Sequence, residues 1–113
     1  DIWKALGWEV VLSFFLMFVI VSVATDTRAV ETMAGAANGA TVTLASFVGG
    51  PVTGSSMNPA RSLAPALFAC ELGNLWIYFV GPSMGAILAA VVYNFIRCEP
   101  AVENAPASAK GCC

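Results

Sequence analysis

The polar residues best placed to do chemistry lie in one short stretch in the middle of the chain, TGSSMNPARS. Asn58 followed by Pro59 is typical of a helix start: Asn accepts hydrogen bonds from free backbone N–H groups, and Pro at the first helical position gives up only an N–H that has no partner. Arg61 is the only charged residue between Glu31 and Glu71. Lipid offers no acceptor to the free backbone N–H groups at a helix start, and it disfavours a charged side chain. In so apolar a chain, this helix start and Arg61 therefore predict a cavity lined by water or by protein.

The composition is that of a membrane protein. Of 113 residues, 58% are hydrophobic and 11% are charged, whereas a soluble domain carries about a quarter charged residues. A net charge of −2, without histidine or a basic cluster, argues against a nucleic-acid partner. The four cysteines lack CxxC spacing, and no histidine could complete a zinc site. We therefore expect neither a metal nor a cofactor.

The elements that must position the central stretch are helical. We predict membrane-spanning helices over about residues 5–25, 32–49 and 75–97, each close to the roughly 20 residues that a crossing needs. The segment 51–70 separates the second span from the third, and its helical part, 59–69, is too short to cross. The sequence thus predicts an all-α membrane protein with three transmembrane helices and one re-entrant half-helix.

Small residues on two of these spans predict close helix–helix contacts, because small side chains let helices approach each other in a membrane. They recur every four positions on one face of each span: Gly35, Gly39 and Thr43, then Gly81, Gly85 and Ala89. Gly49-Gly50-Pro51 is expected to end the second span. Asn38, which lies within that span, is expected to form a hydrogen bond between helices.

The ends of the chain indicate its orientation. Residues 98–113 are small and polar, and they predict a disordered tail. Arg28, Arg97 and Lys110 fall on one side of the predicted spans, whereas Lys4 alone falls on the other. The positive-inside rule then places the C-terminus in the cytoplasm. Because the chain does not begin with Met and has no signal-peptide pattern, we expect a longer protein around it.

The residues around the central stretch resemble a known family. The run GSSMNPARSLAPA, residues 54–66, is similar to the second signature loop of the aquaporins, the major intrinsic protein family. Glu9 stands where that family has a buried glutamate in its fourth helix, and LWIYFVGP resembles the start of its sixth. The runs ATDTRAV and GPVTG resemble the plant nodulin-like intrinsic proteins in particular. The resemblance covers about residues 5–97 and implies the C-terminal half of a six-helix fold built from two inverted halves.

This resemblance implies roles for individual residues. Asn58, Pro59 and Ala60 would form a pore motif, in which the Asn58 amide donates a hydrogen bond to a passing oxygen. The dipole of the half-helix would disfavour cations at the same place. Arg61 would line the filter, and Glu9 would accept backbone N–H bonds from the loop. The alternatives are a plain helix cap for Asn58, an arginine at the membrane interface, and an interfacial carboxylate.

Two serines fall at further filter positions of the family when counted from Asn58. Ser46 lies at the position where strict water channels carry histidine, and Ser55 lies at the position within the loop. Two small hydroxyls predict an opening wider than that of a water channel, similar to the filters of silicic-acid and boric-acid channels. The alternative is that both serines bond to backbone carbonyls and line nothing.

The function expected from these observations is passive transport. The chain would be the C-terminal half of a plasma-membrane channel for water and small neutral solutes, such as glycerol and boric, silicic or arsenious acid. Its expected partners are the lipid bilayer, an N-terminal half with the first Asn-Pro-Ala motif, and further copies in a homotetramer. A non-conducting fragment or assembly partner is the alternative. An enzyme is not expected, because the chain lacks a nucleophile with a nearby base.

Overall fold

In the described part of the chain, residues 1–25 and 31–97 of the computed structural model, helices are joined by short loops and there is no strand. This part contains α1 (Ile2–Thr25), a short 3-10 turn η1 (Glu31–Met33), α2 (Ala34–Thr53), α3 (Pro59–Ala69) and α4 (Leu75–Ile96). The prediction of an all-α fold is therefore confirmed. The sequence also predicts a polar turn over residues 26–31, most of which lies outside the described residues, as does the predicted tail, 98–113.

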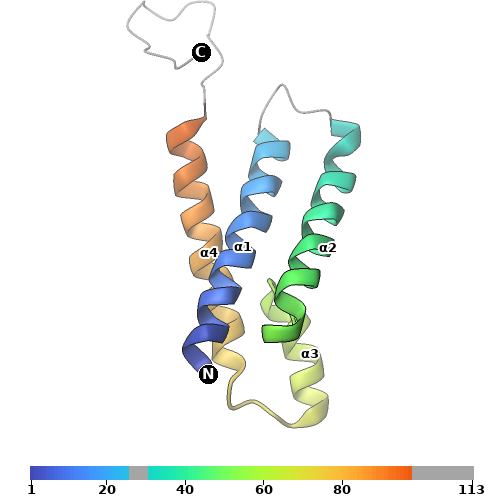
Figure 1. The fold of residues 1–113 in the computed structure, drawn as a ribbon, viewed down its shortest axis with the longest axis vertical. Helices are drawn as coiled ribbons and strands as arrows, with labels where there is room; N and C mark the ends of the chain where they lie inside the picture. The colour runs from blue at the N-terminus through green and yellow to red at the C-terminus, as the bar shows by residue number, and fades with distance from the viewer. Residues whose placement is uncertain (26–30, 98–113) are drawn as a thin grey trace, which may run out of the picture.

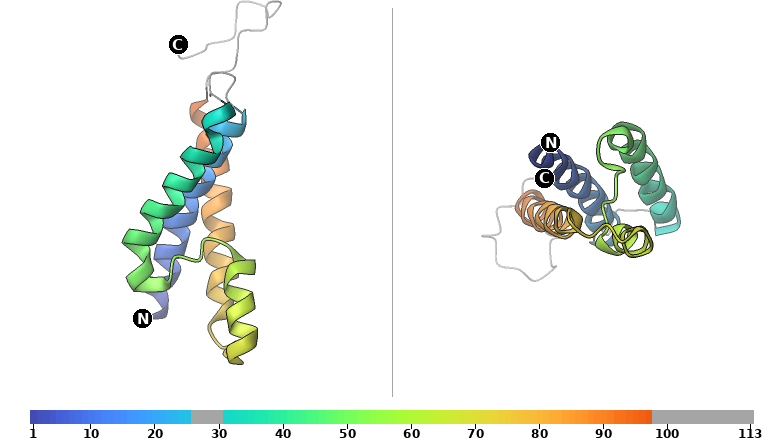
Figure 2. Two further views of the ribbon diagram at one scale, coloured as in Figure 1. Left: turned by 90° about the vertical axis from the view of Figure 1, so that its right-hand side faces the viewer. Right: turned by 90° about the horizontal axis from the view of Figure 1, so that it is seen from below.

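The three long helices lie side by side, with α1 between α4 and α2 (Figure 1). α1 packs on both neighbours, and α3 packs on α4. The loop after α2 turns back before α3 begins, and α3 then runs out again toward the end of the molecule where α4 starts (Figures 1 and 2). The short helix is thus held at one end of the three-helix layer.

Two of the described helices are long and apolar enough to cross a membrane. They are α1, with 24 residues, and α4, with 22 residues. α2 has 20 residues but is not one of them, because glycine, alanine, threonine and serine stand where the other two helices carry larger aliphatic and aromatic residues. Length and composition therefore support the first and third predicted spans as membrane-spanning helices, but they give no such support to the second.

The C-terminus of α2 differs from the prediction. The helix does not end at residues 49–51 but continues to Thr53, with Pro51 inside its last turn. Pro51 removes one backbone hydrogen bond, the one that an N–H at this position would donate to the Phe47 carbonyl, and the helix continues for only two residues beyond it. The helix ends at Gly54, which has a φ of 78° and donates its N–H to the Gly50 carbonyl at 3.0 Å. Glycine adopts this left-handed conformation with little strain.

The start of α3 is the one expected from the sequence. Asn58 is the N-cap, and its side-chain oxygen accepts a hydrogen bond from the Ala60 N–H at 3.0 Å. Pro59 occupies the first helical position. Pro65 lies inside the helix without breaking it, and Cys70 ends it in a left-handed conformation, with a φ of 54°. Local sequence signals therefore account for the start of α3, whereas its end falls at a cysteine, a residue without a preference for the left-handed conformation.

The small-residue face of α4 makes the close contact that was predicted. Gly81, Gly85 and Ala89 are all buried. A Cβ built on Gly81 would lie 2.8 Å from the Cβ of Glu9, and one on Gly85 would lie 2.9 Å from the backbone N of Phe14. α1 and α4 can therefore pack at this distance only because these positions have no larger side chain.

The small-residue face predicted for α2 makes no such close contact at Gly35 or Gly39 within the described part of the chain. Nothing in the described part of the chain lies within 4 Å of a Cβ built on Gly35 or Gly39. The close approach of α2 to α1 falls instead at Gly49, where a Cβ would collide with the side chain of Leu12. Asn38 does not form the predicted bond through its side-chain oxygen, which is buried without a partner among the described residues. The residue spacing predicted a face of small side chains on α2, but it did not predict which of these residues packs against another helix.

Candidate functional site

A buried carboxylate holds the loop that leads into α3. Glu9, on α1, is fully buried. Its two carboxylate oxygens accept hydrogen bonds from the backbone N–H groups of Ser56, at 3.1 Å, and Met57, at 2.9 Å. Glu9 therefore lies where the resemblance places it, against the loop and not at an exposed interface.

This loop needs such support because its backbone is strained. Ser55 and Met57 have φ values of 46° and 50°, in the left-handed region. For residues other than glycine this conformation costs about 1–2 kcal/mol each. Such strain persists only where surrounding contacts fix the backbone. The two hydrogen bonds to Glu9 provide that fixation at the strained segment.

Ser55 does not point into an open cavity, contrary to the expectation that its hydroxyl helps to form a filter. Its side chain is fully buried, and its hydroxyl donates to the Ala45 carbonyl of α2 at 2.8 Å. A Cβ on Gly49 would lie 2.6 Å from the Ser55 oxygen, so this glycine makes room for the contact. A buried hydroxyl without a partner would cost about 1–3 kcal/mol, which explains why the hydroxyl faces α2.

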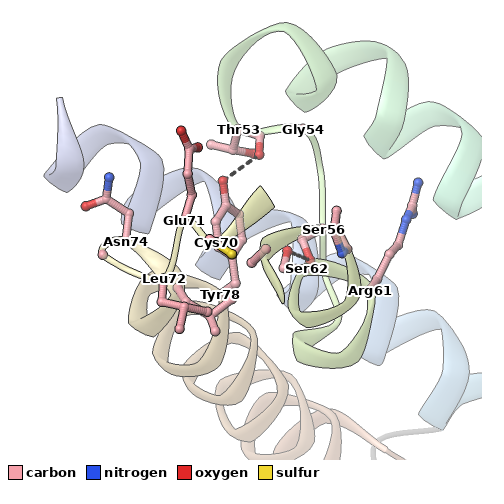
Figure 3. A pocket seen from close by; sticks show the side chains of 14 residues that line it. Thr53, Gly54, Ser56, Arg61, Ser62, Cys70, Glu71, Leu72, Asn74 and Tyr78 are labelled. Atoms are coloured by element: carbon pink, nitrogen blue, oxygen red, sulfur yellow. Dashed lines mark hydrogen bonds between the residues drawn. The ribbon is translucent and has the colours of Figure 1, made fainter. Parts of the chain in front are cut away.

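Two cavities meet at the start of α3. The smaller, of about 290 Å³, is lined by Ser13, Leu16, Val42, Met57, Asn58 and Pro82, among others. The larger, of about 740 Å³, is lined mostly by polar residues, including Thr53, Ser62, Glu71, Asn74 and Tyr78 (Figure 3). Arg61 and Ser56 belong to the walls of both cavities. The predicted pore motif and the predicted filter arginine therefore border a shared space.

The hydrogen bonds of Asn58 leave one of its groups available. Its side-chain oxygen is held by the Ala60 N–H. Its backbone carbonyl accepts from the Ser56 hydroxyl, at 2.7 Å, and from the Arg61 N–H, at 3.2 Å. The residue is exposed, and its side chain makes no other hydrogen bond in the described part of the chain. Toward the cavity Asn58 therefore offers the amide NH₂, which is only a donor.

The guanidinium of Arg61 is exposed and has no ion-pair or hydrogen-bond partner among the described residues. Its side chain extends away from the hydrogen-bonded pair Tyr78 and Thr53 (Figure 3). Ser46 is half-buried on α2 and is not among the residues that line these two cavities. The described residues contain no group of three or more possible metal ligands.

Comparison with known proteins identifies the family. Residues 1–93 match the family model for the major intrinsic proteins. The chain belongs to this family. It is 51% identical to aquaporin NIP2-3 of Zea mays over 108 residues, which is 96% of this chain and 35% of that protein. It is 54% identical to nodulin-26 of Glycine max over 94 residues, which is 83% of this chain and 35% of that protein. The predicted similarity to plant nodulin-like proteins is confirmed.

This major intrinsic protein spans about a third of the length of the curated relatives it matches. The family consists of integral membrane channels and not of enzymes, in agreement with both predictions. The two helices that are apolar enough to cross a membrane fit this membership.

Two residues near the site of this major intrinsic protein were not predicted from its sequence. Ser13 is 4% exposed and lines the smaller cavity, and its buried hydroxyl has no partner among the described residues. It is the only polar residue between Glu9 and Ser22, and this isolation was a usable signal. Tyr78 donates its hydroxyl to the Thr53 carbonyl at 3.0 Å. No sequence pattern pointed to that bond, because its partner is a backbone atom.

Proposed function

We propose that this chain is the C-terminal half of a passive channel for water and small neutral solutes. In this proposal α1, α2 and α4 cross the membrane, and the loop with α3 is re-entrant. The observation that carries it is the hydrogen bonding of Asn58, which leaves only an amide donor toward the cavity. An amide N–H can bind the oxygen of a neutral solute but offers a cation no ligand, so it favours neutral oxygen-bearing solutes over cations.

The surroundings of Asn58 add to this selectivity. The N-terminus of α3 carries partial positive charge from its helix dipole, and the Arg61 guanidinium adds a full charge at the wall of the same cavity. Both repel a cation, whereas a neutral hydroxyl can accept hydrogen bonds from both groups. Asn58 would face a second Asn-Pro-Ala motif from an N-terminal half. The complete channel would be a homotetramer in the plasma membrane, with its C-terminus in the cytoplasm.

The solute class is proposed from Ser46. Its hydroxyl makes no hydrogen bond within the described residues, whereas Thr41 and Thr43 on the same helix bond to backbone carbonyls at 2.8 Å. A small residue with a free hydroxyl favours a wide, polar opening suited to glycerol or to boric, silicic or arsenious acid. Ser55 no longer supports this proposal through its hydroxyl, which is bonded to α2.

Replacing the amide of Asn58 tests the proposed channel. Asn58→Asp keeps an oxygen that caps α3 but replaces the amide donor with a charged carboxylate oxygen, so we expect the permeability to water and glycerol to fall at least about twofold, the lower end of what one hydrogen bond is worth. The measurement is stopped-flow light scattering of vesicles that contain the full-length protein. Asn94→Asp, at an exposed position on α4, is the control and should change little. Equal permeability of the Asn58→Asp variant and the unmodified protein would refute the pore role.

The alternative function is a non-conducting fragment or assembly partner without transport of its own. The same vesicles distinguish the two functions. If the unmodified full-length protein gives no more flux than vesicles without protein, the channel proposal fails and the alternative stands.

Enlarging Ser46 tests the proposed solute class. Ser46→His should narrow the opening, so we expect boric acid and glycerol permeability to fall about tenfold or more, as for a size mismatch in a binding pocket, and water permeability to fall less. Thr43→His, on an exposed part of the same helix, is the control for adding an imidazole. Equal losses for all three solutes would contradict a filter role for Ser46. Uptake and swelling should be recorded on the same vesicle preparation.

A further inference from the structure

Two serine hydroxyls join α3 to the loop that precedes it. The Ser62 hydroxyl donates to the Ser56 oxygen at 2.6 Å, and the Ser56 hydroxyl donates to the Asn58 carbonyl at 2.7 Å. Ser56 is 6% exposed, so water does not readily replace this chain of bonds. The hydrogen bonds run in one direction, from the first turn of α3 through the loop to the cap of the same helix.

Ser62 behaves differently from other serines on helices of this molecule. Ser22 and Ser83 donate to the carbonyl four residues earlier in their own helix, which is the usual local bond. Ser62 instead reaches outside α3, to a residue two positions before the helix cap. The bond is therefore a tertiary contact, comparable to the staple by which residues flanking a cap fix the angle at which a chain enters a helix.

The hydrogen bond between Ser62 and Ser56 lies beside Arg61 and bears on the placement of its side chain. Ser62 directly follows Arg61 in the first turn of α3, so a bond that fixes Ser62 against the loop also fixes the rotation of that turn. Ser56, at the other end of the bond, lines both cavities together with Arg61. The backbone N–H of Ser56 is itself held by Glu9. The start of α3 is thus connected through Ser56 to α1.

We propose that Ser62 is a positioning residue that sets the placement of the Arg61 guanidinium through Ser56, and thereby the selectivity between solutes. This inference rests on the channel function proposed above. It assigns no contact between Ser62 and the solute, since Ser62 acts through another residue. Its loss should alter the ratio of permeabilities more than the total flux.

The test compares two substitutions at Ser62 in the full-length protein. Ser62→Ala removes the first donor, and we expect the ratio of glycerol to water permeability to change about two- to tenfold, the range of one hydrogen bond. Ser62→Thr keeps the hydroxyl and should restore the original ratio. Ser83→Ala, which removes an exposed serine hydroxyl from α4, should leave the ratio unchanged. An unchanged ratio in Ser62→Ala, or an equal change in both Ser62 variants, would overturn the proposal.

A double variant separates positioning from a general loss of packing. Because Ser62 acts through Ser56, the variant with both serines changed to alanine should show the ratio of Ser56→Ala alone. Additive effects would show that the two hydroxyls act independently and would overturn the proposal.

Hydrogen exchange keeps the test independent of transport. The backbone amides of Ser56 and Met57 should exchange faster in Ser62→Ala than in Ser62→Thr, because the loop loses one of its attachments. If the unmodified protein conducts nothing, the channel proposal fails, whereas this exchange result still supports or refutes the link between Ser62 and the loop. Equal exchange in the two variants would refute that link.

Discussion

Glu9→Gln is expected to lower both the stability and the water permeability of the full-length protein. Both oxygens of Glu9 accept backbone N–H bonds from the strained loop, and the side chain is fully buried. Glutamine offers a single oxygen and places an NH₂ group against the second N–H. Leaving one buried donor unsatisfied costs about 1–3 kcal/mol, and the left-handed backbone of Ser55 and Met57 then loses part of its support.

The expected result is a lower thermal unfolding temperature of the full-length protein in detergent, together with a lower water permeability, because the loop beside Asn58 is held less firmly. Glu71→Gln is the matched control. Glu71 is an exposed carboxylate beside the larger cavity, so this variant should unfold at the original temperature. If the two variants were equally stable, the loop would not depend on the Glu9 carboxylate.

Gly85→Ala is expected to disturb the packing of α1 on α4. The added Cβ would lie 2.9 Å from the backbone N of Phe14 and 3.0 Å from the Cβ of Ser13. Backbone atoms cannot move aside as the end of a flexible side chain can, so the two helices must separate. Overpacking of this kind costs about 1–3 kcal/mol. The unfolding temperature should fall by several degrees, as for a loss of about 1 kcal/mol or more in a domain of this size.

Gly7→Ala serves as the control for this prediction. Gly7 lies on α1, and nothing in the described part of the chain is within 4 Å of a Cβ built at this position. Alanine favours a helix by about 1 kcal/mol over glycine, so this variant should be as stable as the original or more so. A Gly85→Ala variant that unfolds at the same temperature as Gly7→Ala would show that α1 and α4 tolerate a larger spacing.

The sequence by itself determined the features that depend on residues close to one another in the chain. Asn58 and Pro59 specify the start of α3, because a cap and a first helical position are local signals. The apolar runs of α1 and α4 predicted two long helices, and these are found. The spacing of Gly81 and Gly85 predicted the face of α4 that packs on α1. The family was recognised from the same local residues.

Only the tertiary structure decided how the polar side chains are used. Glu9 and Ser56 are 47 residues apart in the chain, and Ser55 bonds to a carbonyl ten residues away. Ser62 reaches Ser56 instead of its own helix. These partners are backbone atoms or small hydroxyls, which leave no distinctive pattern in a sequence. Whether a serine faces a cavity or a neighbouring helix depends on which buried acceptor would otherwise remain unpaired, and that is determined only when the helices pack together.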